Sequence, residues 1–253
     1  MHVLSSTRLL FFTTLSVTFL NTTAQITVSK YEIGAKGGVF VYQGDLAPSD
    51  AGSYKTLRPQ FGFFVSRLLS SSFAVRLNFD AGSVHGDDAK YSSPWWRQDR
   101  KFRFSSPLYE LSAQLVLDIL GRNYDRPVKS LSPYVFVGAG YTFLNVHRDW
   151  SRLNTTVFNA ESDAVAGLAI DSATSLNRGT VVFPVGLGIR YALTKKISLI
   201  GESSFRFIPT DYLDGFSQAA NPNKNDHYYS HSLGIVYSFG VKNNWDCPPA
   251  MRY

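Results

Sequence analysis

Ser232-Leu233-Gly234-Ile235-Val236-Tyr237-Ser238-Phe239 is a run in which large apolar side chains alternate with mostly small or polar ones. Strict alternation of this kind predicts a β-strand with two unlike faces. The apolar face of such a strand can pack against the core of a soluble protein. In a membrane β-barrel the same face contacts lipid instead. The earlier segments of the chain therefore have to show which environment applies.

The same alternation recurs in seven earlier segments. The eight predicted strands span 31–44, 57–69, 72–86, 103–119, 132–146, 179–193, 196–210 and 226–240. One face of each is apolar, whereas the other collects Gly, Ser and charged residues, a pattern that favours lipid outside and a polar interior. The residues expected on lipid include Val75, Leu77, Leu115, Val185, Leu187 and Ile235. A lipocalin-like soluble barrel would invert the faces, and periodicity alone leaves a β-sandwich open.

The connections between these strands alternate in length. The shorter ones are 70–71, 120–131 and 194–195, and the longer ones are 45–56, 87–102, 147–178 and 211–225. Outer-membrane barrels combine short periplasmic turns with long extracellular loops, and an even strand number brings both termini to the periplasmic side. The sequence thus predicts an all-β fold, an eight-stranded antiparallel transmembrane β-barrel over residues 25–240.

The two ends of the chain have other characters. Residues 1–24 combine a basic residue, an apolar stretch and small residues, which predicts a secretory signal peptide. The alternative, a transmembrane helix, needs about 20 apolar residues, more than this stretch offers. Residues 241–253 are expected to form a periplasmic tail. Its Cys247 is the single cysteine, so no disulfide can form within one chain.

Composition and motifs exclude several functions. The net charge is +6, without a basic helix or a nucleic-acid module, so no nucleic-acid partner is expected. Outer-membrane lipid and lipopolysaccharide are better partners for exposed Lys and Arg. The sequence has no metal-ligand cluster, no glycine-rich phosphate loop and no nucleophile elbow, so neither a cofactor nor a metal is expected.

The polar face of the predicted strands carries eight charged residues. They are Lys36, Arg76, Asp80, Glu110, Asp118, Arg190, Glu202 and Arg206. The interior of an eight-stranded barrel is just wide enough for side chains to fill it. Buried charges have to be paired, so we expect these residues to form an ion-pair network. A barrel filled in this way is not a diffusion porin, and its activity has to lie on loops, on the lipid face or in partners.

Two groups of residues are candidates for such contacts. Trp95, Trp96, Arg97 and Arg100 in the loop 87–102 suit lipid headgroups, since aromatic rings prefer that depth and cations meet phosphate there. On the predicted periplasmic side, Arg122, Tyr124 and Arg126 lie in one turn, and Trp245 lies in the tail. Arg and Trp are common interface anchors, which makes these four candidates for binding a protein partner.

An enzyme is a weaker hypothesis. Some eight-stranded barrels modify lipid A with His and Ser near the outer rim, and this chain carries Asp226, His227, Ser230, His231 and Ser232 at the start of its last strand. A serine nucleophile needs a base within hydrogen-bond reach and a third group that orients the base. The spacing does not show that arrangement, so the sequence predicts a protein without catalytic residues.

The last strand resembles the signal that the bacterial outer-membrane assembly machinery reads. Gly234, Tyr237 and Phe239 occupy its defined positions, after the polar Ser232. The whole mature chain also resembles the PorG-like outer-membrane barrels of Bacteroidota, which belong to the type IX secretion and gliding machinery. The resemblance is carried by segments 31–34, 42–46, 86–88, 106–112, 132–140, 183–188 and 202–214, the last ending Thr210-Asp211-Tyr212-Leu213-Asp214.

The resemblance implies a scaffold that links a periplasmic protein complex to the outer membrane. The loop 147–178 departs from the family, since it lacks a clear counterpart of the family's glycine-containing segment. Two rival functions remain: a stand-alone barrel for adhesion or for stabilising lipopolysaccharide, and a barrel enzyme that modifies lipid A.

Overall fold

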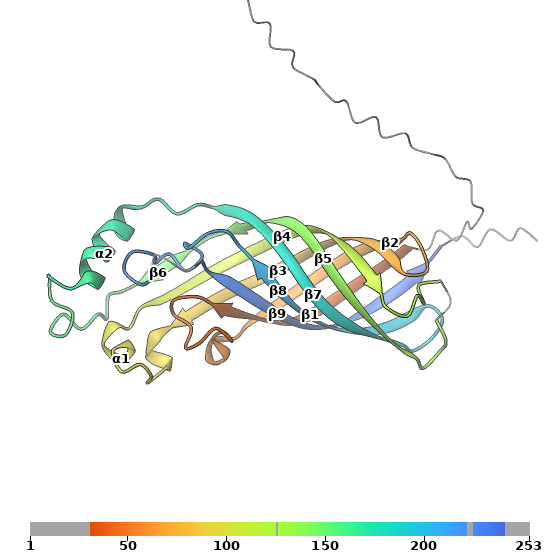
Figure 1. Cartoon of the computed structure of the whole chain (residues 1–253), viewed down its shortest axis with the longest axis horizontal. Helices are drawn as coiled ribbons and strands as arrows, with labels where there is room; N and C mark the ends of the chain where they lie inside the picture. The colour runs from red at the N-terminus through yellow and green to blue at the C-terminus, as the bar shows by residue number, and fades with distance from the viewer. Residues whose placement is uncertain (1–30, 125, 222–224, 241–253) are drawn as a thin grey trace, which may run out of the picture.

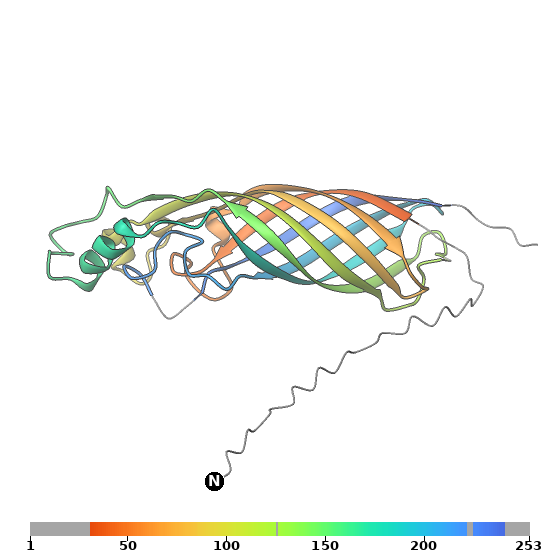
Figure 2. The same cartoon turned by 90° about the horizontal axis from the view of Figure 1, so that it is seen from above.

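Eight long strands close into a barrel in the computed structural model, which describes residues 31–124, 126–221 and 225–240 (Figures 1 and 2). The strands are β1 (Tyr31–Gln43), β2 (Arg58–Leu68), β3 (Phe73–Asp87), β4 (Arg103–Asp118), β5 (Leu131–Leu144), β7 (Gly179–Ala192), β8 (Ile197–Phe207) and β9 (His227–Phe239). Each pairs antiparallel with its neighbours, and β9 pairs with β1, with Phe239 opposite Tyr31. The predicted fold class is confirmed.

The strand boundaries differ from the prediction by a few residues. The largest difference is at β8, which was expected to reach residue 210 and ends at Phe207. Pro209 follows two residues later, and proline has no N–H to donate to a strand ladder. The short strand β6 (His147–Asp149) was not predicted; it pairs with the start of β4, where Arg103 lies opposite Asp149.

Short helices gather at one end of the barrel, which we call the loop end; the other is the turn end (Figure 1). They are η1 (Tyr54–Thr56), η2 (Asp88–Lys90), α1 (Arg97–Arg100) and α2 (Asp163–Ala173). Within the described ranges, none of these helices has the length and apolar character to cross a membrane.

The two faces of the barrel wall follow the predicted alternation. Leu187, Ile235 and Leu77 on the outside are 60%, 58% and 55% exposed, and Val75, Leu115 and Val185 are exposed beside them. The residues between them in sequence point inward, and most of them are buried, charged ones included. An apolar exterior around a polar interior is the reverse of a lipocalin-like barrel and is typical of a membrane barrel.

The interior is filled in layers. One cluster of buried apolar residues lies at the loop end and includes Phe40, Phe104 and Phe216. A second lies towards the turn end and includes Phe64, Tyr134 and Phe136. Charged side chains occupy the space between the two clusters. The predicted signal peptide 1–24 and tail 241–253, with Trp245 and Cys247, lie outside the described residues.

Candidate functional site

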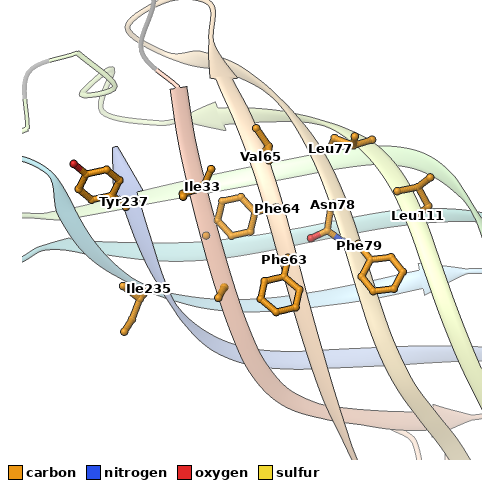
Figure 3. A pocket seen from close by; sticks show the side chains of 12 residues that line it. Ile33, Phe63, Phe64, Val65, Leu77, Asn78, Phe79, Leu111, Ile235 and Tyr237 are labelled. Atoms are coloured by element: carbon orange, nitrogen blue, oxygen red, sulfur yellow. The ribbon is translucent and has the colours of Figure 1, made fainter. Parts of the chain in front are cut away.

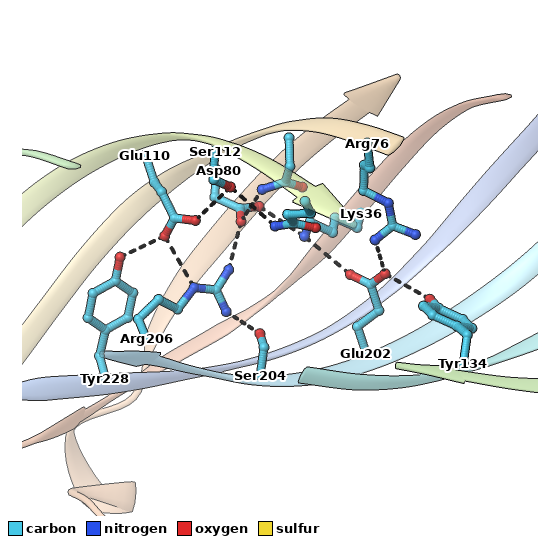
Figure 4. A network of polar contacts seen from close by, with 12 residues as sticks. Lys36, Arg76, Asp80, Glu110, Ser112, Tyr134, Glu202, Ser204, Arg206 and Tyr228 are labelled. Atoms are coloured by element: carbon cyan, nitrogen blue, oxygen red, sulfur yellow. Dashed lines mark hydrogen bonds and ion pairs between the residues drawn. The ribbon is translucent and has the colours of Figure 1, made fainter. Parts of the chain in front are cut away.

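A charged network fills the middle of the barrel (Figure 4). Glu202 on β8 accepts hydrogen bonds from Arg76 at 2.5 Å, from Lys36 at 3.3 Å and from the Tyr134 hydroxyl at 2.7 Å. The Tyr134 ring fits because residue 188 on the adjacent strand is glycine: a Cβ there would lie 2.4 Å from the ring. Three strands besides β8 therefore meet at one carboxylate inside the lumen.

Two further carboxylates, those of Asp80 and Glu110, complete this network. Arg206 lies 2.8 Å from Asp80 and 3.2 Å from Glu110, and the Tyr228 hydroxyl donates to Glu110 at 2.8 Å. Lys36 lies 3.3 Å from Asp80 and so joins the two halves. All of these side chains are buried. They cross the lumen and occupy it at mid-height.

The remaining two predicted interior charges lie apart from this network, near the turn end. Arg190 donates to Glu32 at 3.1 Å, and Arg126 donates to the same carboxylate at 2.6 Å. Asp118 accepts from the Ser132 hydroxyl at 2.7 Å and from the backbone N–H of Leu120 at 3.0 Å. The predicted charges are therefore divided among three groups of polar contacts, and the Arg190 guanidinium also lies 5.5 Å from the Tyr134 ring of the central network. Glu32 was missed, although it lies in phase with Lys36 on the inward face of β1.

The turn after β4 folds under the barrel rather than away from it. Its Asn123 is buried and donates to the Ser70 carbonyl at 3.1 Å, while Tyr124 packs against the turn-end apolar cluster. Arg126 and Tyr124, predicted to contact a partner, are thus part of the closure, because buried Glu32 needs cations beside it. Arg122 stays half-exposed and donates to the Leu131 carbonyl at 3.3 Å.

At the loop end, Arg97 and Arg100 are buried, each only 5% exposed. They pair with the fully buried Asp88 at 2.8 and 2.6 Å, and Arg97 also donates to the carbonyls of Asp45, Leu46 and Ala47. This corrects the expectation that they contact headgroups, since both guanidiniums are directed at a buried carboxylate. Trp96 lies against them, with its ring 4.7 Å from the Arg100 guanidinium. Trp95 is 68% exposed.

Two buried carboxyls of the loop between β8 and β9 contact the same hydroxyl, that of Tyr42 on β1. The Tyr42 hydroxyl lies 2.6 Å from Asp214 Oδ2 and 2.8 Å from Asp226 Oδ1, and all three residues are buried. A hydroxyl has one proton and can donate to only one carboxylate, so the other contact needs a proton on a carboxyl. Burial raises the pKa of both Asp214 and Asp226, and the charges of neighbouring carboxylates raise it further.

Backbone N–H groups approach both carboxyls. Asp226 Oδ2 accepts from Leu213 and Asp214 at 3.1 and 3.2 Å, and Asp214 Oδ1 accepts from Phe216 at 2.7 Å. One carboxyl of the pair therefore holds a proton and donates it to the Tyr42 oxygen, while the other accepts from the Tyr42 hydroxyl. We call the three residues the loop clasp, because they tie the β8–β9 loop to the end of β1.

Helix α2 is held against the same loop by one carboxylate. Asp171, 1% exposed, accepts the backbone N–H groups of Ser217, Gln218 and Ala219 at 2.9 to 3.1 Å. Gly167 of the helix lies against the loop backbone, where a Cβ would be 2.2 Å from the Gln218 carbonyl oxygen. Neither the loop clasp nor this contact was predicted, since loop sequences carry no periodicity that brings distant residues together.

Apolar grooves run along the outer face of the barrel. One of about 510 Å³ lies between Ile33, Phe63, Leu77, Phe79 and Tyr237 (Figure 3). Another of about 630 Å³ runs beside Val185 and Phe205, and a third of about 510 Å³ runs over Gly37 and Gly201. Their position in the exposed apolar band makes them places for hydrocarbon chains.

Among the residues considered for catalysis, Ser230 and Ser232 point into the barrel, whereas His231 points outward. Its partner is a residue that the sequence did not suggest: Ser203 Oγ lies 3.0 Å from His231 Nδ1, on the neighbouring strand. Tyr54 Oη lies 3.3 Å from the other ring nitrogen. A tyrosine thus stands where a hydrolytic triad has a carboxylate. No group of His, Cys, Asp and Glu in the described ranges could hold a metal ion.

The chain belongs to the family described as a domain of unknown function (DUF6089), whose profile matches residues 7–248. No curated protein matches it. Among solved structures, it is similar to Ail of Yersinia pestis in complex with a heparin analogue, at 12% identity and a TM-score of 0.44, covering 83% of this chain and 99% of Ail. Neisserial surface protein A matches at 13% identity and 0.44, covering 83% and 97%. OprG of Pseudomonas aeruginosa matches at 12% and 0.44, covering 84% and 97%.

Proposed function

We propose that this member of the DUF6089 family is a non-enzymatic β-barrel anchor of the bacterial outer membrane that acts through protein contacts and not by transport. The apolar band of exposed side chains around the barrel supports a membrane location, and closed barrels with this alternation belong to outer membranes. In this proposal the turn end and both termini face the periplasm, and the loop end faces outward.

The observation that carries the proposal is the filled lumen. Glu202, Arg76 and Arg206 are 5% exposed or less, and apolar clusters lie above and below them. Buried charges that are paired in this way are held in place, because breaking a pair leaves the other charge uncompensated. A barrel with this interior supplies a rigid membrane support and no aqueous path.

A conductance measurement tests the absence of transport. The full chain, reconstituted in a planar lipid bilayer, is expected to give no stepwise ion conductance, with a water-filled porin as the positive control. Stable open steps of porin size would contradict the proposal, because they require a continuous aqueous lumen.

The finer form of the proposal is a scaffold subunit of a type IX-like secretion complex. The resemblance to PorG-like barrels supports it, and the partner would be a periplasmic protein of that complex. Two residues are proposed to contact it: Arg122, which is half-exposed at the turn end, and Trp245 of the predicted tail, which lies outside the described residues. Arg126 and Tyr124 are left out, because closure of the barrel engages their side chains.

A stand-alone barrel for adhesion or for stabilising lipopolysaccharide is the second candidate. The ordered loop end favours this candidate, since contacts of the buried Asp88 and Asp171 hold the long loops in place. Trp95 stays exposed on these loops. Rigid loops that present an aromatic side chain suit recognition of an external ligand.

A deletion and two point variants, one at each end of the molecule, distinguish the two candidates. Deletion of 243–253 or Trp245→Ala is expected to spare barrel assembly but to reduce co-purification of periplasmic proteins and secretion. Trp95→Ala, at the opposite end, is the control and should change neither. Full secretion and unchanged partner recovery in the deletion strain would refute the scaffold. Loss of surface attachment only with Trp95→Ala would favour the stand-alone barrel.

A further inference from the structure

Two polar side chains interrupt the apolar outer face of the barrel. Ser203 on β8 and His231 on β9 lie opposite each other in register, joined by the 3.0 Å contact described above. Leu233, the next outward residue of β9, is 75% exposed. Polar side chains that face hydrocarbon are costly without a partner, and an ionisable residue there points to a function.

The polar contacts continue to a third group at the rim. Tyr54 Oη lies 3.3 Å from His231 Nε2, and the rings of Tyr54 and Tyr229 both stack on the imidazole, at 6.2 and 6.4 Å between centroids. A neutral imidazole supplies one N–H, and the two hydroxyls supply two O–H groups. These three donors serve two contacts. In either tautomer one hydroxyl, of Ser203 or of Tyr54, therefore has a proton left to donate.

Two of the outer-face grooves meet at Ser203. The groove of about 510 Å³ is lined by Gly37, Gly201 and Leu233, and the groove of about 630 Å³ by Val185 and Phe205; Ser203 and Leu187 line both. Crowding requires Gly38 in this groove but not Gly37 or Gly201: a Cβ would have no neighbour closer than 3.8 Å at Gly37 and 3.4 Å at Gly201. The open floor of this groove is thus a feature that a side chain would remove.

We propose that this site binds a membrane lipid with two acyl chains, one in each groove, whose ester carbonyl accepts the spare O–H of Ser203 or Tyr54. The grooves lie in the apolar band, so their occupant is hydrocarbon. The spare donor calls for an acceptor at the top of that hydrocarbon, and an acyl ester carries its carbonyl there. Tyrosines at the site suit the depth where chains meet headgroups. This binding goes beyond the anchoring role.

Paired lipids test the carbonyl contact. The full chain in detergent micelles is mixed with diacyl phosphatidylcholine or with its ether-linked dialkyl analogue of equal chain length, and retained lipid is counted by native mass spectrometry. The wild type is expected to retain the ester lipid roughly fivefold better, as one hydrogen bond provides. Ser203→Ala, Tyr54→Phe and His231→Phe together should abolish the preference, because the imidazole N–H would otherwise be left free to donate to the carbonyl. Ser83→Ala, elsewhere on the outer face, should keep it.

Groove-filling variants test the chain contacts separately. Gly37→Leu and Gly201→Leu should lower retention of both lipids severalfold, while Ala81→Leu, on the outer face of β3, should not. Each variant is first checked for the gel mobility shift of a folded barrel, so that lost binding is not confused with lost folding. Equal retention of ester and ether lipids by the wild type would overturn the carbonyl contact. Unchanged retention in both glycine variants would overturn the grooves as the binding site.

Discussion

At the scale of single residues, the loop clasp makes the loop end sensitive to pH. The folded state holds a proton on the Asp214–Asp226 pair that ordinary aspartates would have lost, since burial raises the pKa of both carboxyls. Asp45 and Asp211 add negative charge around the pair, and Arg97 faces Tyr42 from α1. A raised folded pKa gives stability that is complete below about pH 4, the usual pKa of Asp, and is lost as pH rises through the folded value.

We therefore predict that the β8–β9 loop opens more readily as the pH increases. Hydrogen exchange at the amides of Leu213, Asp214 and Phe216, corrected for intrinsic rates, should show protection that falls with increasing pH. Asp214→Asn should remove this dependence, because its amide can donate to the Tyr42 oxygen without a titrating proton. Protection in the wild type that stays constant across the range would contradict the clasp.

The interior network makes a second prediction at this scale. Glu202→Gln leaves Arg76 and Lys36 without a full counter-charge inside the barrel, and breaking a buried pair costs about 3–5 kcal/mol. Arg103→Gln is the matched control: it breaks an ion pair whose side chains are 44% and 33% exposed, worth about 0.2–1 kcal/mol. Urea unfolding in micelles measures both. Equal losses in the two variants would mean that the network contributes no more than a surface pair.

At the scale of elements, each long strand separates lipid from the interior. Leu187 lies outward on β7, opposite Ser203, and is 60% exposed. Leu187→Arg should destabilise the barrel, because an Arg side chain that faces hydrocarbon costs up to roughly 2–4 kcal/mol, depending on its depth. The free energy of folding into lipid vesicles measures this, with Leu193→Arg at the turn end as a control expected to cost about 0–1 kcal/mol. A negligible loss at Leu187 would place this position outside the membrane.

The last strand, β9, is part of the barrel wall and is also predicted to carry the signal for outer-membrane assembly. Tyr237 and Phe239 of β9 lie on the outer face, each 42% exposed, and Gly234 lies where a Cβ would be 2.6 Å from the Ala35 carbonyl oxygen. If β9 is the assembly signal, Phe239→Ala should lower the amount of barrel in the membrane of cells but not its refolding into detergent. Leu233→Ala on the same face is the control. Equal cellular levels of the two variants would argue against a signal at Phe239.

At the scale of the whole molecule, closure of the sheet predicts resistance to detergent. Ten or more register pairs join most neighbouring long strands, including β1 to β9, so the barrel has no free edge. An unheated sample in dodecyl sulfate should therefore migrate faster than a boiled one. Co-migration of the two samples would show that the barrel does not stay closed in detergent.

The sequence by itself determined the barrel and its two faces. A period of two places Leu187 and Ile235 on one side and Glu202 and Arg206 on the other, and eight such segments with alternating connections leave few folds. It also placed charge in the interior, because Glu110 and Arg76 lie in phase with the inward glycines and serines. These conclusions rest on the alternation within each segment and on the lengths of the connections, both of which a sequence displays directly.

Only the tertiary structure decided which of these residues meet. The pairs Arg76–Glu202 and Ser203–His231 depend on strand register, and a period of two fixes the face of each residue but leaves shifts by two residues open. The pair Arg126–Glu32 depends on the path of the turn after β4. The loop sequences have no period, so they do not show that Asp88 forms an ion pair with Arg97 or that Tyr42 contacts both Asp214 and Asp226. Buried charges and hydroxyls take whatever partners closure of the barrel brings within hydrogen-bond reach, so their pairing follows from the closed fold.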